Sequence, residues 1–200
     1  MKIDRYGTDH DDVYCYPDST VLRNRLGIQD AGRLREAERN ITALRILALR
    51  QHPPAGAMNF QYLCRLHHAI FQDIYDWSGQ VRTVNINKGN LFCLAQNIEP
   101  MATDLFNQLA RERCLIGCPP GEMPLRLAYY LSEINVIHPF REGNGRTQRL
   151  FIELLAERRG YEVDFSEVSG REMIVASAES FACNYASMNA LFTRITRKRK

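Results

Sequence analysis

The chain has 200 residues, of which 45% are hydrophobic and 24% charged, and its formal net charge is +3. The length suits one domain, and the composition is that of a globular protein, which excludes a disordered or fibrous chain. No apolar run approaches the roughly 18 residues that a membrane span needs, and the first residues lack the apolar core of a secretory signal. We therefore expect a cytoplasmic protein in which residues 1–200 form a single domain.

The excess of positive charge lies in residues 194–200, which carry five basic groups and no acid. The remaining residues have a net charge of −2. A short basic run of this kind is usually a solvated end of the chain, and binding of nucleic acid is the less favoured alternative.

Six cysteines are scattered along the chain, and a chain of this length needs no disulfides to fold, so we expect reduced thiols. Cys64 with His67, and Cys114 with Cys118, raise the alternative of a zinc site. Neither pair has a second pair at the spacing of a zinc finger, and Cys64 and His67 both fall on an apolar helix face, so packing in the core is favoured.

The spacing of apolar residues predicts a helix that begins after Asp30 as N-cap and buries Leu34 and Ile41. A second helix follows from Phe60 to Ile74 and is expected to stop before Gly79.

The segment 82–93 breaks this helical period. It is rich in β-branched residues on one side of an Asn-Lys-Gly-Asn cluster, a pattern typical of two short strands around a tight turn. Because a lone hairpin is marginally stable, it suggests an edge on which a partner docks, and an ordinary surface loop is the alternative. Further helices are predicted at 98–112, 122–137, 145–159, 171–182 and 185–197.

The segment from His138 to Arg149 carries the strongest functional signal. Pro139 disfavours helical geometry at His138, so the preceding helix must end there. Gly143 and Gly145 allow close backbone approach and expose N–H groups at the start of the next helix, where the dipole favours anions. Arg146 and Arg149 are three residues apart and share one side of that helix, so the segment predicts a polyphosphate site.

Two further residues of this segment predict chemistry beyond binding. A carboxylate such as Glu142 would repel a phosphate unless a hard cation such as Mg²⁺ lies between them. His138 has an ordinary pKa of about 6.5, which suits proton abstraction near neutral pH. Because activation of a nucleophile within the protein is the only piece absent from the segment, the attacking hydroxyl is expected to belong to a substrate.

Residues His138–Arg149 resemble, position for position, the H-x-F-x-[D/E]-G-N-G-R-x-x-R signature of the Fic family, part of the Fic/Doc superfamily. Residues 71–79 are similar to the family segment that leads into its flap, and the hairpin at 82–93 falls where that flap belongs. The resemblance implies an all-α fold, a Fic-type helical bundle with one small β-hairpin flap.

The resemblance also implies the activity of a protein adenylyltransferase, which transfers AMP from ATP to a Ser, Thr or Tyr hydroxyl of a target protein and releases pyrophosphate. Phe140 would be a buried anchor of the loop, and the flap would hold the target as an added strand. The implied site residues are His138 as base, Glu142 as Mg²⁺ ligand, Gly143, Asn144, Gly145, Arg146 and Arg149 for ATP, and Asn85, Ile86, Asn87, Lys88 and Gly89 for target docking.

Family members often carry an inhibitory helix with the pattern [S/T]-x-x-x-E-[G/N]. In this chain the fourth residue after Thr8 is Asp12 and the fourth after Ser132 is Val136, and no other Ser or Thr is followed by the required Glu. The chain thus resembles the family branch of bacterial toxins inhibited by a separate small antitoxin. By that analogy, possible targets are the type II topoisomerases, DNA gyrase (first its B subunit) and topoisomerase IV.

Two alternatives remain open at this stage. Relatives that transfer phosphate have a lysine in place of the second glycine, and because this chain has Gly145, transfer of AMP is favoured over phosphotransfer. A non-catalytic nucleotide-binding or DNA-binding module would need the phosphate site but would have no use for His138.

Overall fold

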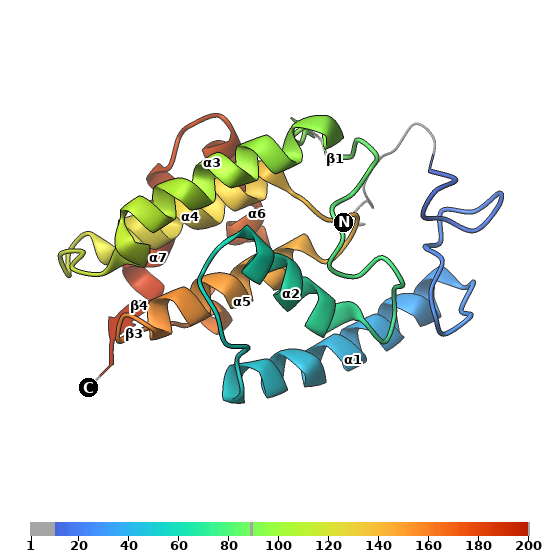
Figure 1. The fold of residues 1–200 in the computed structure, drawn as a ribbon, viewed down its shortest axis with the longest axis horizontal. Helices are drawn as coiled ribbons and strands as arrows, with labels where there is room; N and C mark the ends of the chain where they lie inside the picture. The colour runs from blue at the N-terminus through green and yellow to red at the C-terminus, as the bar shows by residue number, and fades with distance from the viewer. Residues whose placement is uncertain (1–10, 89, 200) are drawn as a thin grey trace.

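Helices account for most of residues 11–88 and 90–199, the part of the chain that the computed structural model describes. The expected helical bundle with a small hairpin is confirmed (Figure 1). The helices are α1 (Ala31–Gln51), α2 (Phe60–Phe71), α3 (Ile98–Arg111), α4 (Met123–Ile137), α5 (Asn144–Glu157), α6 (Gly170–Phe181) and α7 (Ala186–Ile195). The strands are β1 (Asn87–Lys88), β2 (Asn90–Leu91), β3 (Tyr161–Val163) and β4 (Thr196–Lys198).

Helix α5 lies at the centre of the bundle and packs against α1, α2 and α4. Its apolar face, which includes Phe151, Ile152 and Leu155, is fully buried. Helix α4 also packs against α3, α6 and α7. The segment that carries the predicted chemistry is therefore the loop between two central helices, α4 and α5.

Local sequence signals predicted most of the helix ends closely. Asp30 caps α1, since its side chain accepts a hydrogen bond from the N–H of Arg33 at 2.8 Å. The prediction of a second helix as far as Ile74 was wrong, because α2 ends at Phe71. Residues 72–78 form a turn instead. This turn places Tyr75 against α1, where its hydroxyl donates a hydrogen bond to the carboxylate of Glu38.

The hairpin is shorter than predicted. Its pairs are Asn87 with Leu91 and Lys88 with Asn90, so the strands occupy only the tip of the segment 82–93. The predicted turn residue, Gly89, lies outside the described residues. Below the strands, the N–H of Phe92 donates to Ile86 O (3.3 Å). The two feet of the hairpin also bond to the loop around His138, through Arg82 N–H to Pro139 O (2.9 Å) and Cys93 N–H to Val136 O (3.1 Å).

A second antiparallel sheet, between β3 and β4, was not predicted. The helix expected over 185–197 ends at Ile195, and the backbone of residues 196–198 pairs with residues 161–163. The described part of the basic end has its charged side chains exposed to solvent, as expected, and its Arg194, Arg197 and Arg199 form surface ion pairs with glutamates. These partners are Glu172, Glu167 and Glu157, respectively.

All six cysteines are free thiols, as expected. Cys64 packs against the core, and burial raises its pKa to about 11. Among the described residues, no helix is both long and apolar enough to cross a membrane.

Candidate active site

His138 ends helix α4 in a left-handed backbone conformation (φ 47°, ψ 61°), outside the right-handed helical region that the following proline disfavours. Its ring nitrogen Nδ1 lies 3.1 Å from the carbonyl oxygen of Asn135. A carbonyl only accepts, so Nδ1 carries the proton and Nε2 has the lone pair. The ring is thus held in the tautomer that a general base needs.

The ring of His138 is almost fully buried. Phe92, from the foot of the hairpin, stacks on it with ring centroids 3.8 Å apart and planes inclined by 20°. Burial lowers the pKa of His138 to about 3, with a smaller contribution from the positive charges of Arg82 and Lys88. The imidazole is therefore neutral, the form that accepts a proton, throughout the physiological pH range.

Phe140 anchors the loop, as predicted, and is fully buried. It stacks on His67 of α2 at a centroid distance of 3.9 Å. His67 accepts the N–H of Gly79 on Nδ1 (2.8 Å), so its Nε2–H donates to the carbonyl of Glu142 at 3.0 Å. Burial lowers the pKa of His67 to about 3. His67, considered above as a metal ligand, is instead a neutral core residue that supports the loop.

The loop closes on itself through Asn144. The side chain of this residue accepts from the N–H of Phe140 (2.9 Å) and donates to the carbonyl of the same residue (2.6 Å). Its side chain is therefore occupied in shaping the turn, and only its backbone N–H remains for a ligand. Gly143 has φ +82°, and a Cβ there would lie 2.2 Å from the ring of Phe71. The glycine is thus required by both conformation and space.

Helix α5 begins with an anion site. Its N-cap is Gly143, which has no side chain to cap the first N–H groups, so those groups point out of the helix end. The guanidinium of Arg149 folds back over Gly145, with Nη1 3.2 Å from where a Cβ would be. Burial, and then the charge of Arg146, lower the pKa of Arg149. Two guanidiniums therefore lie near the uncapped N–H groups at the start of α5.

Arg146 belongs to a charged network that the sequence did not reveal. Its guanidinium forms ion pairs with Glu38 of α1 and, at 3.5 Å, with Glu142. Glu38 also accepts a hydrogen bond from the hydroxyl of Tyr75. Burial alone would lower the pKa of Arg146, but the two carboxylates outweigh it and raise the pKa. Glu38 lies on the polar side of an ordinary amphipathic helix, so no local signal marked it.

Glu142 is 27% exposed and its Oε1 accepts the N–H of Gly143 at 2.8 Å. Burial, and then the charge of Glu38, raise the pKa of Glu142. Carboxylate oxygen is the ligand that Mg²⁺ prefers, and a cation beside Glu142 would relieve the repulsion between the two acids. The donor chemistry of the site therefore fits Mg²⁺, with most of its ligands left to phosphate oxygens and water.

The predicted docking residues differ in how far they are exposed to solvent. Ile86 is buried, and Asn85 accepts the N–H of Ala95 at 2.9 Å, so both support the base of the hairpin. Asn87 and Lys88 are exposed on strand β1.

A segment before α1, which sequence analysis left unassigned, also contacts the loop. Asp11 forms a buried ion pair with Arg141, a variable position of the signature. The hydroxyl of Tyr14 lies 3.1 Å from the N–H of Thr83 and accepts its hydrogen bond. Both contacts join residues far apart in sequence, so spacing along the chain could not reveal them.

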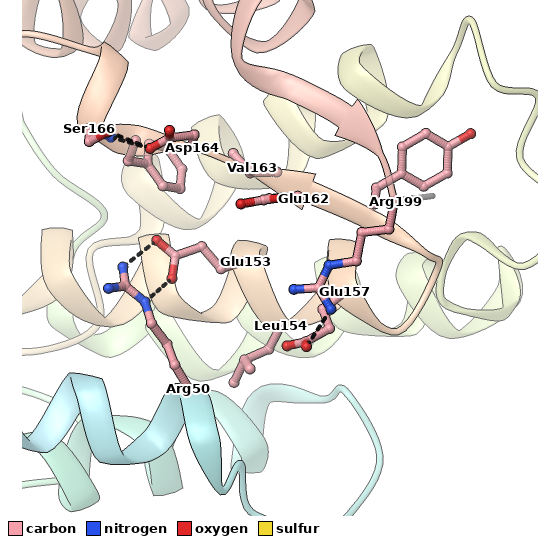
Figure 2. A pocket seen from close by; sticks show the side chains of 11 residues that line it. Arg50, Glu153, Leu154, Glu157, Glu162, Val163, Asp164, Ser166 and Arg199 are labelled. Atoms are coloured by element: carbon pink, nitrogen blue, oxygen red, sulfur yellow. Dashed lines mark hydrogen bonds and ion pairs between the residues drawn. The ribbon is translucent and has the colours of Figure 1, made fainter.

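A cavity of about 360 Å³ lies at the far end of α5, between α1 and the sheet of β3 and β4. Figure 2 shows its two ion pairs, Arg50 with Glu153 and Arg199 with Glu157. The guanidinium of Arg50 binds both carboxylate oxygens of Glu153 at 2.8 Å. No residue of the predicted site lines this cavity.

Comparison with known proteins agrees with this geometry. Residues 57–156 match the model of the Fic/DOC family. The chain is 36% identical, over 96% of its length and 94% of the relative's, to "Probable protein adenylyltransferase Fic" of Salmonella typhimurium. It is also 40% identical over 92% of its length to protein adenylyltransferase VbhT of Bartonella schoenbuchensis, of which it spans only 38%. The chain therefore belongs to the Fic/DOC family.

Solved structures support the fold. The N-terminal Fic domain of a VirB-translocated effector from Bartonella quintana, crystallised with ADP, superposes with a TM-score of 0.88 at 30% identity, covering 94% of this chain and 95% of that one. BepC of Bartonella tribocorum, crystallised with AMPPNP, gives 0.87 at 28% identity, covering 94% and 97%.

Proposed function

We propose that this chain acts in the cytoplasm as a single Fic domain that transfers AMP from ATP to a Ser, Thr or Tyr hydroxyl of a target protein. The enzyme class, a protein adenylyltransferase, follows from the family and from relatives aligned over 92–96% of the chain. The single observation that carries the proposed chemistry is the loop 138–149, which joins a neutral, oriented imidazole to an anion site with two guanidiniums.

In the proposed reaction the hydroxyl oxygen of the target forms a bond to the α-phosphorus, and the bond from that phosphorus to the bridging oxygen breaks, so that pyrophosphate leaves. His138 Nε2 takes the hydroxyl proton. The loop residues Gly143, Asn144 and Gly145 hold the α- and β-phosphates, the last two through their backbone N–H groups, while Arg146 holds the β-phosphate and Arg149 the γ-phosphate. Glu142 would hold Mg²⁺, which neutralises phosphate charge when bound. Catalysis then rests on positioning and charge stabilisation.

The flap is the proposed docking element for the target. Its exposed strand, with Asn87 and Lys88, offers main-chain groups to an extended peptide, while Asn85 and Ile86 hold the base of the hairpin in place.

The test is transfer of label from ATP labelled at either the α- or the γ-phosphate, with a bacterial lysate as the source of targets. Label from the α-position, together with a mass increase of one AMP, supports the proposal. Label from the γ-position alone would instead show a phosphotransferase.

His138→Ala should reduce transfer by a factor of about 10² to 10⁴ and leave nucleotide affinity intact, since the base acts in the transition state. A non-catalytic binding module would lose no biological effect in this variant.

We further propose that the protein is the toxin of a toxin–antitoxin pair, with an antitoxin that supplies the S/T-x-x-x-E-G/N helix. This is supported by the lack of that pattern in the sequence and by Arg149, which forms no ion pair with any residue in 11–88 or 90–199. Arg149→Ala should make activity insensitive to the antitoxin. Co-expression of a neighbouring small protein that bears the pattern and leaves activity unchanged would contradict the proposal.

The proposed targets are type II topoisomerases. Purified gyrase B subunit and topoisomerase IV, incubated with the protein and ATP, should gain the mass of AMP on one hydroxyl. Unmodified topoisomerases in a lysate where other proteins are labelled would redirect the search without affecting the transfer chemistry.

A further inference from the structure

Arg82 is the largest fully buried side chain in the described part of the protein, with 1% of its surface exposed. It lies at the first foot of the hairpin. Its guanidinium donates hydrogen bonds to four backbone carbonyl groups, and these come from two different parts of the chain. They are Val84 O (2.7 Å) and Cys93 O (2.5 Å) in the hairpin, and His138 O (2.9 Å) and Ile137 O (3.4 Å) at the end of α4.

The arrangement uses the shape of the guanidinium. Five N–H donors in one rigid plane can reach carbonyls on several sides at once, which a lysine ammonium cannot do in the same geometry. Because Val84 precedes strand β1 and Cys93 follows strand β2, Arg82 bridges the two feet of the flap. Because it also binds the carbonyls of Ile137 and His138, the same group ties both feet to the end of α4.

Further contacts continue this connection. The N–H of Arg82 itself donates to Pro139 O, and the N–H of Cys93 donates to Val136 O, so each foot has its own bond to the loop. Phe92, the residue before Cys93, stacks on the ring of His138. Any shift of the flap feet would therefore move the ring that covers His138 and the carbonyl groups on either side of its Cα.

We propose that Arg82 is a positioning residue that fixes the flap relative to His138, and so sets the distance between a docked target hydroxyl and the base. This inference rests on the proposed function, since it concerns the acceptor side of the same reaction. It assigns Arg82 no contact with nucleotide: its partners lie in the flap and at the end of α4, whereas the phosphate site is built on the start of α5.

The test compares Arg82→Lys with wild type in three measurements: thermal unfolding, ATP affinity by calorimetry, and steady-state transfer to a purified target. We expect ATP affinity to stay within twofold, while kcat for transfer falls about 100-fold, the loss typical of a displacement near 1 Å at a reacting centre. KM for the target should rise in parallel, because the flap no longer presents the peptide in register. A purely structural role would lower ATP affinity together with transfer.

The matched control is Arg158→Lys, which also replaces a guanidinium bonded to a backbone carbonyl (Gly56 O, 2.7 Å) but lies away from the flap. This variant should transfer AMP at the wild-type rate. If Arg82→Lys fails to fold, Phe92→Leu provides a second test, since it removes the ring stacked on His138 and leaves the arginine in place. It should lower kcat about tenfold with unchanged ATP affinity.

Transfer by folded Arg82→Lys or by Phe92→Leu within threefold of wild type would overturn the inference. So would a loss of ATP affinity that matches the loss of transfer. If wild-type protein itself transfers no AMP, the proposed function fails, and this result is distinct from one in which wild type and Arg82→Lys are equally active.

Discussion

Two separate constraints, backbone conformation and available space, require a glycine at Gly143 in the loop. Its φ of +82° disfavours any side chain, and the ring of Phe71 fills the space that a Cβ would occupy. Gly117 has the same φ of +82°, but no heavy atom lies within 4 Å of its Cβ position. Comparing alanine substitutions at the two glycines therefore distinguishes the cost of backbone strain from the cost of steric overlap.

We predict that Gly143→Ala lowers the free energy of unfolding by about 2–4 kcal/mol, the sum of left-handed strain and overpacking against Phe71. Gly117→Ala should cost only about 1 kcal/mol, the strain alone. Urea unfolding of both variants measures the difference. Equal costs would show that Phe71 moves aside freely and that the close approach is not constraining.

At the residue scale, sequence analysis located the candidate site residues but not the residues that support them. His138, Phe140 and the two glycines were marked by a proline, a turn and a long contiguous signature. His67, Phe92 and Arg82 were not, because their importance comes from contacts across 11 to 75 positions of the chain. A buried arginine or histidine in an isolated sequence looks like any other polar residue on an amphipathic segment.

Helix α1 shows the same point at the scale of an element. Its helical character and its N-cap were predicted correctly, yet the element also contributes Glu38 to the arginine at the start of α5. In this position Glu38 partly neutralises a cation that is proposed to bind phosphate. The site thus includes a helix that ends more than eighty residues before the signature begins.

We predict that Glu38→Gln tightens binding of ADP in the absence of divalent cations by about three- to tenfold, because a negative charge beside the phosphate site is removed while the side-chain shape is kept. Glu36→Gln, at an exposed position on the same helix, is the matched control and should leave affinity unchanged. Calorimetry measures both. Weaker binding by Glu38→Gln would mean that orienting Arg146 matters more than neutralising it.

Elements with a strong local period were predicted well, and elements formed by distant pairing were not. The ends of α3 to α6 differ from their predicted positions by one or two residues. Strands β3 and β4 have three residues each and lie about 35 positions apart, so neither has a period long enough to recognise. Helix α2 stops early because Tyr75 turns toward Glu38, a contact that no helical pattern contains.

At the scale of the whole molecule, the described residues include two histidines that are buried in neutral form. Burial lowers the pKa values of His67 and His138 to about 3, below the ordinary value of about 6.5. Below pH 6.5 the unfolded chain therefore binds protons that the folded chain does not, and stability must decline as the pH falls toward 3.

We predict that the free energy of unfolding is highest above pH 6.5 and that these two groups together make it fall by about 2.7 kcal/mol per pH unit between pH 5.5 and 4. Urea midpoints measured from pH 8 to 4 give the slope. His67→Gln should reduce it by about half, whereas His52→Gln, at an exposed position, is the matched control. A slope that His67→Gln leaves intact would contradict the assignment.

The buried pair of Asp11 and Arg141 has a consequence for how related chains can diverge. Each partner is almost inaccessible to water, so replacing either one alone strands a charge inside the protein at a substantial energetic penalty. Replacing both residues together avoids leaving an unpaired buried charge. Across an alignment of homologues, positions 11 and 141 should therefore covary. Position 11 lies outside the signature, so a search restricted to the signature would not include it.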